Sequence, residues 1–229
     1  MGNKSHFFRQ SSGGVIGSPF LNFRFEESIT DDNTVIDNIG GLNATLTGAK
    51  TVRENTGAIQ RGYKFNGSAR VNLEPTPSNY PFCIKYWANL NNNLNSFLYI
   101  TQWDNTYGGL SLIYYSNRLQ IGFGNGGTPS SSNRKTFETS SISVGNEWKQ
   151  FVIIVKSDFD FDLYIDGVIY SLGYSENGGA TSVVYSNNFE IGKQSSGISL
   201  DEFTIFNQEL TPEEISEIYN KESNGIRAF

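Results

Sequence analysis

Three carboxylates alternate in one stretch of the chain, at Asp158, Asp160 and Asp162. Alternate residues of a β-strand point to the same face, so carboxylates at this spacing would lie close together. Retaining glycoside hydrolases need such a pair, with their two carboxyl groups about 5 Å apart. Here, however, the three residues flank the predicted turn between two strands and do not lie in the middle of one. We therefore interpret them as a solvated hairpin tip, and the stretch does not predict a hydrolase.

Nucleophilic and metal-dependent catalysis lack their usual residues. The only histidine, His6, lies in a polar N-terminal stretch, so the predicted folded part has no Ser-His-Asp combination. No Cys and His residues have the spacing of a zinc site. Cys83, the only cysteine, lies in an apolar run and is interpreted as a small buried hydrophobic residue. We predict that the protein is not an enzyme.

Aromatic and amide side chains that follow one predicted strand could bind a sugar. Trp103, Asp104, Asn105 and Tyr107 come directly after this strand and before two glycines. Exposed aromatic rings can stack on the apolar face of a pyranose, while Asn and Asp side chains bind its hydroxyl groups. These four residues are our candidate ligand-binding residues. In the alternative interpretation, the aromatic side chains of this cluster pack in the core or at its rim.

The end of the chain predicts a strand, a turn and a short helix that would position such residues. Residues 200–206 alternate between two faces, so Leu200 and Asp201 point to opposite sides. Thr211 is a good N-cap, and Glu214 three residues later completes a capping box. The helix, of about two turns, has an apolar face formed by Ile215, Ile218 and Tyr219.

Strands and turns are also predicted upstream. The first strand would direct three side chains inward, those of Leu21, Phe23 and Phe25. Ser116-Asn117 and Asp166-Gly167 are expected to form two-residue hairpin turns. Residues 124–136 are rich in Gly, Ser and Asn and are expected to form a long loop, a kind of segment that is commonly functional or mobile.

Taken in order, these segments resemble the concanavalin A-like superfamily in its laminin-G-like branch, over about residues 19–222. The closing segment carries the resemblance through Gly197, Asp201, Glu202, Ile205, Leu210, Thr211, Glu214, Ile215 and Tyr219. The resemblance implies an all-β protein, an antiparallel two-sheet jelly-roll sandwich with a short C-terminal helix. The composition agrees with β-structure, because only 17% of the residues are charged and 14% are aromatic.

The resemblance also implies a possible cofactor, calcium, since this superfamily often holds the ion with carboxylates and backbone carbonyl groups. Asp201 matches the recurring acidic position of the family, and Asp31, Asp32 or Asp37 from the first loop could approach it. Asp201 and Asp37 are our candidate metal ligands. In the alternative interpretation, Asp201 accepts hydrogen bonds from backbone amides of the neighbouring loop and holds no ion.

Length and charge restrict the organisation and the partners. We expect an N-terminal arm or linker at residues 1–18 and one sandwich domain at residues 19–229. The formal net charge of −6 argues against nucleic acid as a partner. No run of 18 apolar residues predicts a membrane span, and the N-terminus lacks the apolar core of a signal peptide. We expect an extracellular protein or one on a virion surface.

Two functions are compatible with these patterns. The first is a non-catalytic recognition module that binds a glycan or a cell-surface glycoconjugate, through loops at one edge or through the concave sheet. The alternative is a structural or adhesive virion component, such as a bacteriophage head or tail appendage, that attaches to other virion proteins through residues 1–18. The fold alone does not decide between them, because this sandwich serves enzymes, lectins and scaffolds.

Overall fold

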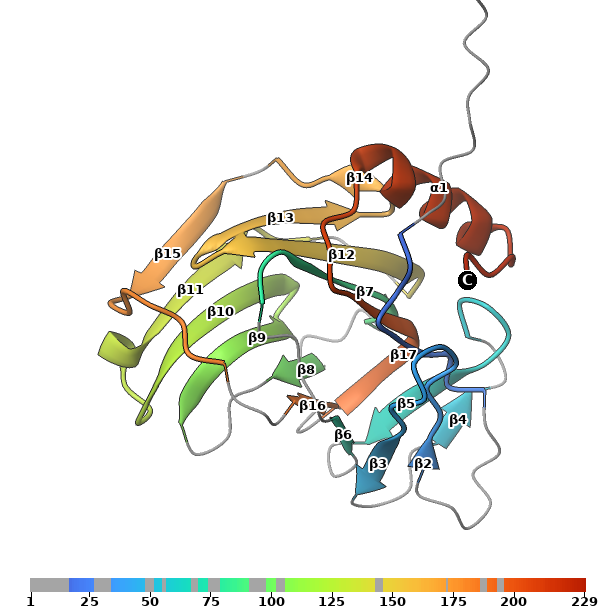
Figure 1. Ribbon diagram of the computed structural model, residues 1–229, viewed down its shortest axis with the longest axis horizontal. Helices are drawn as coiled ribbons and strands as arrows, with labels where there is room; N and C mark the ends of the chain where they lie inside the picture. The colour runs from blue at the N-terminus through green and yellow to red at the C-terminus, as the bar shows by residue number, and fades with distance from the viewer. Residues whose placement is uncertain are drawn as a thin grey trace, which may run out of the picture.

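The computed structural model describes residues 17–26, 34–47, 52–54, 57–66, 70–73, 79–90, 98–101, 106–142, 146–171, 173–185, 189–192 and 196–229. Their strands form two antiparallel sheets that pack as the two layers of a jelly-roll sandwich, with one α-helix near the C-terminus. Figure 1 shows β7, β12 and β13 in one layer and β9, β10 and β11 in the other. The predicted fold class is confirmed.

The first layer, called sheet A, has eight strands. Their order is β14 (Val168–Ile169), β13 (Asp160–Ile165), β12 (Trp148–Ser157), β7 (Phe82–Asn89), β17 (Ser196–Phe206), β5 (Gly62–Asn66) and β4 (Val52–Glu54), and β1 (Leu21–Phe23) also pairs with β17. The strands β7 and β17 lie at its centre, where β7 pairs with both β12 and β17.

The second layer, called sheet B, has nine strands. Their order is β15 (Tyr174–Gly178), β11 (Arg134–Thr139), β10 (Arg118–Gly127), β9 (Tyr107–Tyr115), β8 (Leu98–Thr101), β16 (Phe189–Ile191), β6 (Arg70–Leu73), β3 (Ala44–Thr47) and β2 (Thr34–Val35). A short 3₁₀ helix (Ser131–Asn133) lies between β10 and β11.

The core lies between the two sheets because apolar residues alternate along the strands. In β9, Leu110, Leu112 and Tyr114 belong to it, and Phe151 and Ile153 of β12 face them from sheet A. The expected inward residues of the first strand region, Leu21, Phe23 and Phe25, are all fully buried. Burying apolar area of this kind stabilises a fold by about 25 cal/mol per Å².

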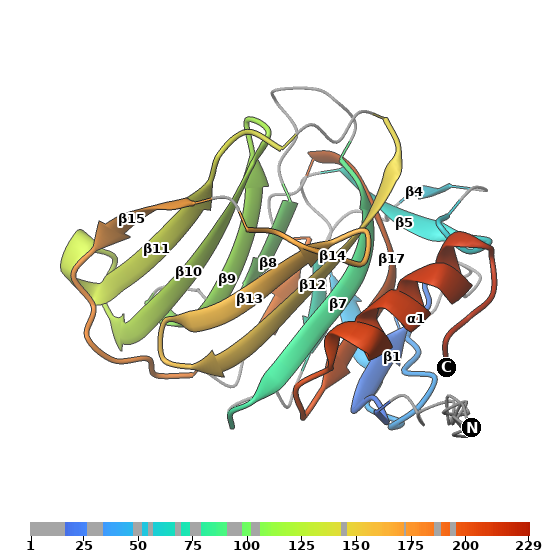
Figure 2. The same ribbon diagram turned by 90° about the horizontal axis from the view of Figure 1, so that it is seen from above.

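The helix α1 (Pro212–Ser223) begins with the predicted capping box. The Glu214 amide donates to Thr211 Oγ1 at 3.2 Å, and the Thr211 amide donates to Glu214 Oε2 at 2.8 Å. The helix covers the outer face of sheet A, where Ile215 and Ile218 are fully buried in a second apolar cluster that includes Cys83. Figure 2 shows α1 lying across this side of the sandwich. The interpretation of Cys83 as a buried hydrophobic residue is confirmed.

The helix is longer than the two turns predicted, since it has 12 residues. Its last turn carries Glu222, which is 1% exposed and forms an ion pair with the buried Lys85 of β7, with 2.5 Å between Nζ and Oε1. Trp87 Nε1 and Gln150 Nε2 also donate to Glu222, at 2.6 and 3.1 Å. These polar contacts with sheet A hold the last turn of α1, which lies beyond the apolar residues Ile215 and Ile218.

Two local predictions about strands need correction. The alternation of residues 200–206 is interrupted, because Glu202 has a φ of 48° and the pairing with β7 shifts between Asp201 and Thr204. The long loop predicted at residues 124–136 is mostly strand, since β10 continues to Gly127 and β11 begins at Arg134.

Both predicted hairpin turns are confirmed. Ser116 and Asn117 have φ values of 48° and 61°, and Asp166 and Gly167 have values of 52° and 75°. Positive φ at both central residues is the signature of a type I′ turn, whose twist matches that of paired strands. The first turn joins β9 to β10 and therefore fixes the register between these two strands.

Candidate functional site

The outer faces of the two sheets differ in what covers them. The outer face of sheet A packs against α1 through the cluster around Val152, Ile154 and Phe206. Among the described residues, no helix lies over the outer face of sheet B (Figures 1 and 2). The outer face of sheet B is therefore our candidate binding surface.

A row of polar and small residues crosses this face. The residues are opposite one another in register on six neighbouring strands: Glu190, Thr101, Ser111, Gly122, Thr136 and Asn177. They point outward because their neighbours along the strands, such as Leu112 and Ile121, lie in the core. The Ser111 side chain is fully buried, and its Oγ has no hydrogen-bond partner among the described residues. We call these six residues the polar row.

A network of charged and aromatic side chains lies on one side of the polar row. Tyr115 OH donates to Glu138 Oε2, and Arg118 Nη1 donates to Glu138 Oε1 at 2.5 Å. The hydrogen bond from Tyr115, together with Arg118, holds the pKa of Glu138 below its usual range. Burial, and then the same bond to Glu138, raise the pKa of Tyr115 to about 12. The Glu138 carboxylate is therefore negatively charged, and the positive charge of Arg118 balances it.

A surface pocket of about 250 Å³ opens beside this network, lined by Arg118, Glu138, Thr139, Ser140, Gly173 and Ser175. Its lining consists of hydroxyl groups, one guanidinium and one carboxylate, with no large apolar side chain. Such a lining suits a small polar ligand that can both donate and accept hydrogen bonds.

A second aromatic and cationic pair lies on the other side of the polar row. The guanidinium carbon of Arg134 lies 5.4 Å from the centre of the Tyr107 ring. Arg134 Nη1 donates to Tyr107 OH at 3.4 Å. Tyr107 opens β9 and Arg134 opens β11, and each follows a connection between strands. The pair thus lies where the outer face meets these connections.

The structure brings one of the four candidate ligand-binding residues to this surface, and that residue is Tyr107. Trp103, Asp104 and Asn105 lie outside the described residues, in the connection between β8 and β9. Their role in binding a ligand stays a prediction. Arg134, Glu138 and Tyr115 were not found from the sequence, because only the register of β9, β10 and β11 brings them to one face.

The carboxylate of the candidate metal ligand Asp37 accepts hydrogen bonds from backbone amides. Its Oδ1 accepts from the amides of Asn22 and Ile39 at 2.9 and 3.1 Å. Its Oδ2 accepts from the amides of Gly40 and Leu42 at 2.8 and 3.0 Å. Four N–H donors surround this carboxylate, so it organises the loop that follows β2.

The candidate metal ligand Asp201 is fully buried and also accepts from backbone amides. Ile59 N donates to Oδ2 at 2.9 Å, and Glu202 N donates to Oδ1 at 2.8 Å. Burial, followed by the charge of Glu202, raises the pKa of Asp201 to about 8.

As placed, Asp37 and Asp201 do not fit a calcium site. Both carboxyl groups already have backbone donors, and the described residues contain no group of three or more His, Cys, Asp or Glu side chains that could hold a metal. The geometry agrees with the alternative interpretation of Asp201. Calcium binding stays an untested prediction for this chain.

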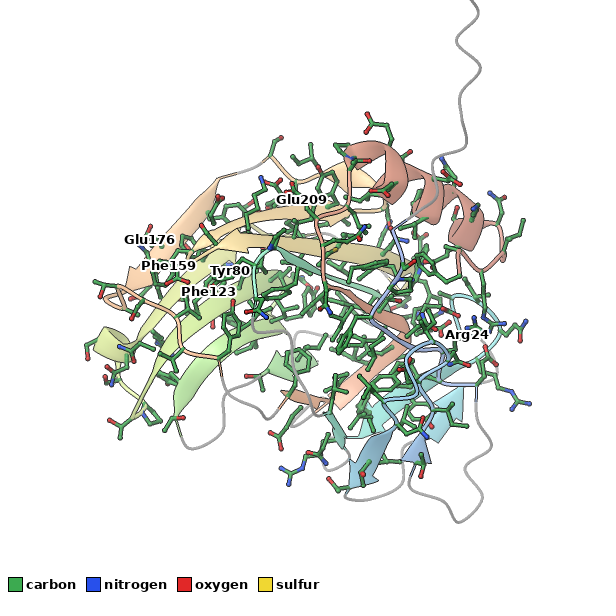
Figure 3. All side chains as sticks on the ribbon, viewed as in Figure 1. Arg24, Tyr80, Phe123, Phe159, Glu176 and Glu209 are labelled. Carbon is green, nitrogen blue, oxygen red and sulfur yellow. The ribbon has the colours of Figure 1, made fainter. Side chains whose placement is uncertain are left out.

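The alternating aspartates lie around a hairpin turn, as predicted. Asp158 follows β12, and its Oδ1 accepts from Tyr80 OH at 2.6 Å. Asp162 forms an ion pair with Lys156 at 2.6 Å. Phe159, which lies between two of these aspartates, has its ring centre 5.8 Å from that of Phe123, and both rings are labelled in Figure 3.

The comparisons with known proteins agree with this fold. The family model of the concanavalin A-like lectin/glucanases superfamily matches residues 63–216. A search of curated proteins found no match.

Several solved structures of botulinum neurotoxins are similar in fold. The binding domain of botulinum neurotoxin DC in complex with SialylT is 17% identical, with a TM-score of 0.66, and the match covers 91% of this chain and 52% of that chain. The receptor-binding domain of botulinum neurotoxin type G is 18% identical, with a TM-score of 0.64 and coverage of 89% and 51%. A type C structure concerned with cell entry through two ganglioside molecules is 18% identical, with a TM-score of 0.64 and coverage of 90% and 51%. This chain therefore spans about half the length of these structures.

Proposed function

The chain belongs to the concanavalin A-like lectin/glucanases superfamily, and we propose that it is a non-catalytic recognition module that binds a glycan or a cell-surface glycoconjugate. The binding surface is the outer face of sheet B together with the β8–β9 connection. The observation that carries the proposal is the arrangement of this face, where half-buried tyrosines, Tyr107 and Tyr115, lie on the two sides of the polar row.

This arrangement supplies what sugar recognition needs. Tyrosine rings offer apolar faces for stacking, and Glu138, Arg118 and Arg134 beside them offer carboxylate and guanidinium groups for sugar hydroxyls. The network of Tyr115, Glu138 and Arg118 is already formed, so binding would cost little side-chain entropy. A face without a covering helix also admits an extended ligand.

The positions of the carboxylates support the absence of catalysis. Asp158 and Asp162 are each bound to another side chain at the ends of the β12–β13 hairpin, and Asp160 is exposed at the start of β13. Glycoside hydrolysis needs two carboxyl groups on either side of a bound sugar, one of them a proton donor. On the outer face of sheet B, Glu138 forms an ion pair with Arg118, and Glu190 forms one with Arg70.

The structural neighbours support a receptor-binding role without defining a ligand. Their descriptions name SialylT, synaptotagmin II and gangliosides as molecules that those neurotoxins bind. This chain spans about half the length of each of these structures. Ligand binding is therefore a property of those longer proteins, and for this chain it is part of our proposal.

A glycan array with the purified protein tests the function, run once with calcium and once with a chelator. We expect saturable binding that weakens at least about fivefold in Trp103→Ala and in Tyr107→Ala, since loss of one stacking ring is worth about 1–3 kcal/mol. Loss of binding in chelator would support the calcium prediction, and unchanged binding would remove calcium from the proposal.

A matched control is Tyr219→Ala, which also removes a half-buried tyrosine ring but lies on α1, where it stacks on Trp87 at 5.9 Å. It should bind glycans like the unchanged protein. A blank array with folded protein would contradict the proposed function.

A further inference from the structure

We propose that Arg134 recognises the carboxylate of an acidic sugar, such as a sialic or uronic acid residue, within the glycan that sheet B binds. The inference rests on the proposed function and adds the chemical class of the ligand. It is argued from the hydrogen bonds of the guanidinium, from the charges around it and from the residues beside it.

Tyr107 orients the guanidinium of Arg134 by contacting the Nη1 side of the group. Its Nη1 donates to Tyr107 OH at 3.4 Å, and its plane lies near the Tyr107 ring, with 5.4 Å between the guanidinium carbon and the ring centre. A cation that stacks on an aromatic ring gains about 0.5–1 kcal/mol at an exposed site and is restricted in its motion. The side chain is thus held in place before any ligand arrives.

On the opposite edge of the guanidinium, the Nε atom is buried and has no acceptor among the described residues. A buried donor left without an acceptor costs about 1–3 kcal/mol, so this edge is suited to an acceptor from outside the chain. The Nε and Nη2 atoms point the same way and match the two oxygens of a carboxylate, which they bind bidentately.

Neighbouring cations are neutralised, whereas Arg134 is not. Lys135, the next residue, forms an ion pair with Glu176 at 2.8 Å, and Arg118 forms one with Glu138 at 2.5 Å. Within the described part of the chain, Arg134 has no carboxylate partner. A net positive charge therefore remains at this point of the face, although the whole chain carries a formal charge of −6.

The positions opposite Arg134 on the two neighbouring strands are glycines, which carry no side chain. Across the strands it is opposite Gly124 of β10, which in turn is opposite Gly109 of β9. A Cβ at Gly124 would lie 2.1 Å from the Tyr107 carbonyl oxygen, so glycine is needed for the close approach of these two strands.

Matched pairs of sugars test the inference by titration calorimetry with the full chain. The first pair is 3′-sialyllactose and lactose, and the second is an oligosaccharide ending in glucuronic acid and its counterpart ending in glucose. The methyl ester of 3′-sialyllactose is a further probe, because it keeps the shape of the sugar and removes the charge. We expect the acid in at least one pair to bind about tenfold or more tightly than its neutral counterpart and its ester.

Three variants connect the effect to Arg134. Arg134→Gln should abolish the preference for the acid, and Arg134→Lys should lose most of it, because lysine keeps the charge without the two-donor edge. Lys135→Gln is the matched control, since it removes the same charge at the next position on the opposite face of β11 and should keep the preference. Unchanged thermal unfolding of each variant shows that the fold is intact.

The outcomes separate this inference from the proposed function. Glycan binding that is equal for acidic and neutral members, or an unchanged preference in Arg134→Gln, would overturn the role of Arg134 and leave the recognition module standing. Binding of neither class, on these sugars or on the wider array, would overturn both. Preference for the acid in only one pair identifies which acidic sugar the site takes.

Discussion

At the scale of single residues, two of the buried carboxyl groups, Asp201 and Glu222, are stabilised in different ways. Glu222 has a buried cation, Lys85, with 2.5 Å between Nζ and Oε1. Within the described part of the chain, Asp201 accepts from the backbone amides of Ile59 and Glu202, and it lies next to the Glu202 carboxylate. The folded protein therefore favours the neutral form of Asp201, whereas Glu222 is held in an ion pair.

The raised pKa of Asp201 makes the stability depend on pH. In the folded state its pKa is about 8, against an ordinary value of 3.8, so the folded protein binds one more proton than the unfolded chain between these values. The free energy of unfolding should therefore fall as the pH rises through this window. In chelator buffer, Asp201→Asn should show a flatter dependence in urea denaturation. An equal slope in both proteins would contradict the shift.

Removing the charge of Glu222 should destabilise the protein strongly. Glu222→Leu leaves the Lys85 ammonium buried without its partner, which typically costs about 3–5 kcal/mol. The matched control is Glu217→Gln in the surface pair with Lys221 of the same helix, where the expected change is at most about 0.5 kcal/mol. Urea denaturation measures both, and a loss of similar size in the two variants would argue against a special role for the buried pair.

The sequence did not predict this ion pair for a physical reason. Lys85 and Glu222 are 137 residues apart, and only the packing of α1 across β7 brings them together. The same holds for Arg118 and Glu138, which meet through the register of β10 and β11. Residues that depend on local chemistry, such as the positive-φ turn at Asp166, could be predicted from their neighbours alone.

At the scale of elements, local signals predicted the start of α1 and tertiary contacts decided its end. The capping box at Thr211 and Glu214 needs no distant partner, so the prediction held. Residues 124–136 were assigned wrongly because their glycines are typical of loops, whereas pairing with β9 and β15 keeps most of them in strands.

The capping box itself can be tested through stability. Thr211→Ala should lower the free energy of unfolding by about 1 kcal/mol, because the Glu214 amide loses its acceptor at the helix N-terminus. Ser216→Ala on the exposed side of α1 is the control and should be neutral or slightly stabilising, since alanine has the higher helix propensity. Equal effects of the two substitutions in thermal or urea unfolding would contradict a capping contribution.

At the scale of the whole molecule, the sequence predicted the sandwich because the family segments occur in order along the chain. It did not predict which face is available, since that depends on where α1 packs. No helix among the described residues is long and apolar enough to span a membrane. The predicted arm at residues 1–18 lies largely outside the described residues, and attachment to a virion through it has no support from the comparisons.

The placement of α1 also determines the orientation in which the domain can be held. Gly17, the first described residue, donates to Glu214 Oε1 of α1 at 3.0 Å, and Phe229, the last residue, packs against Phe206 on the same side of sheet A. Both points of attachment therefore lie on the side away from the outer face of sheet B. A tether, a fusion partner or a sensor surface joined at either point would leave the outer face of sheet B exposed to the solution. A ligand should therefore reach that face equally well after coupling at either point.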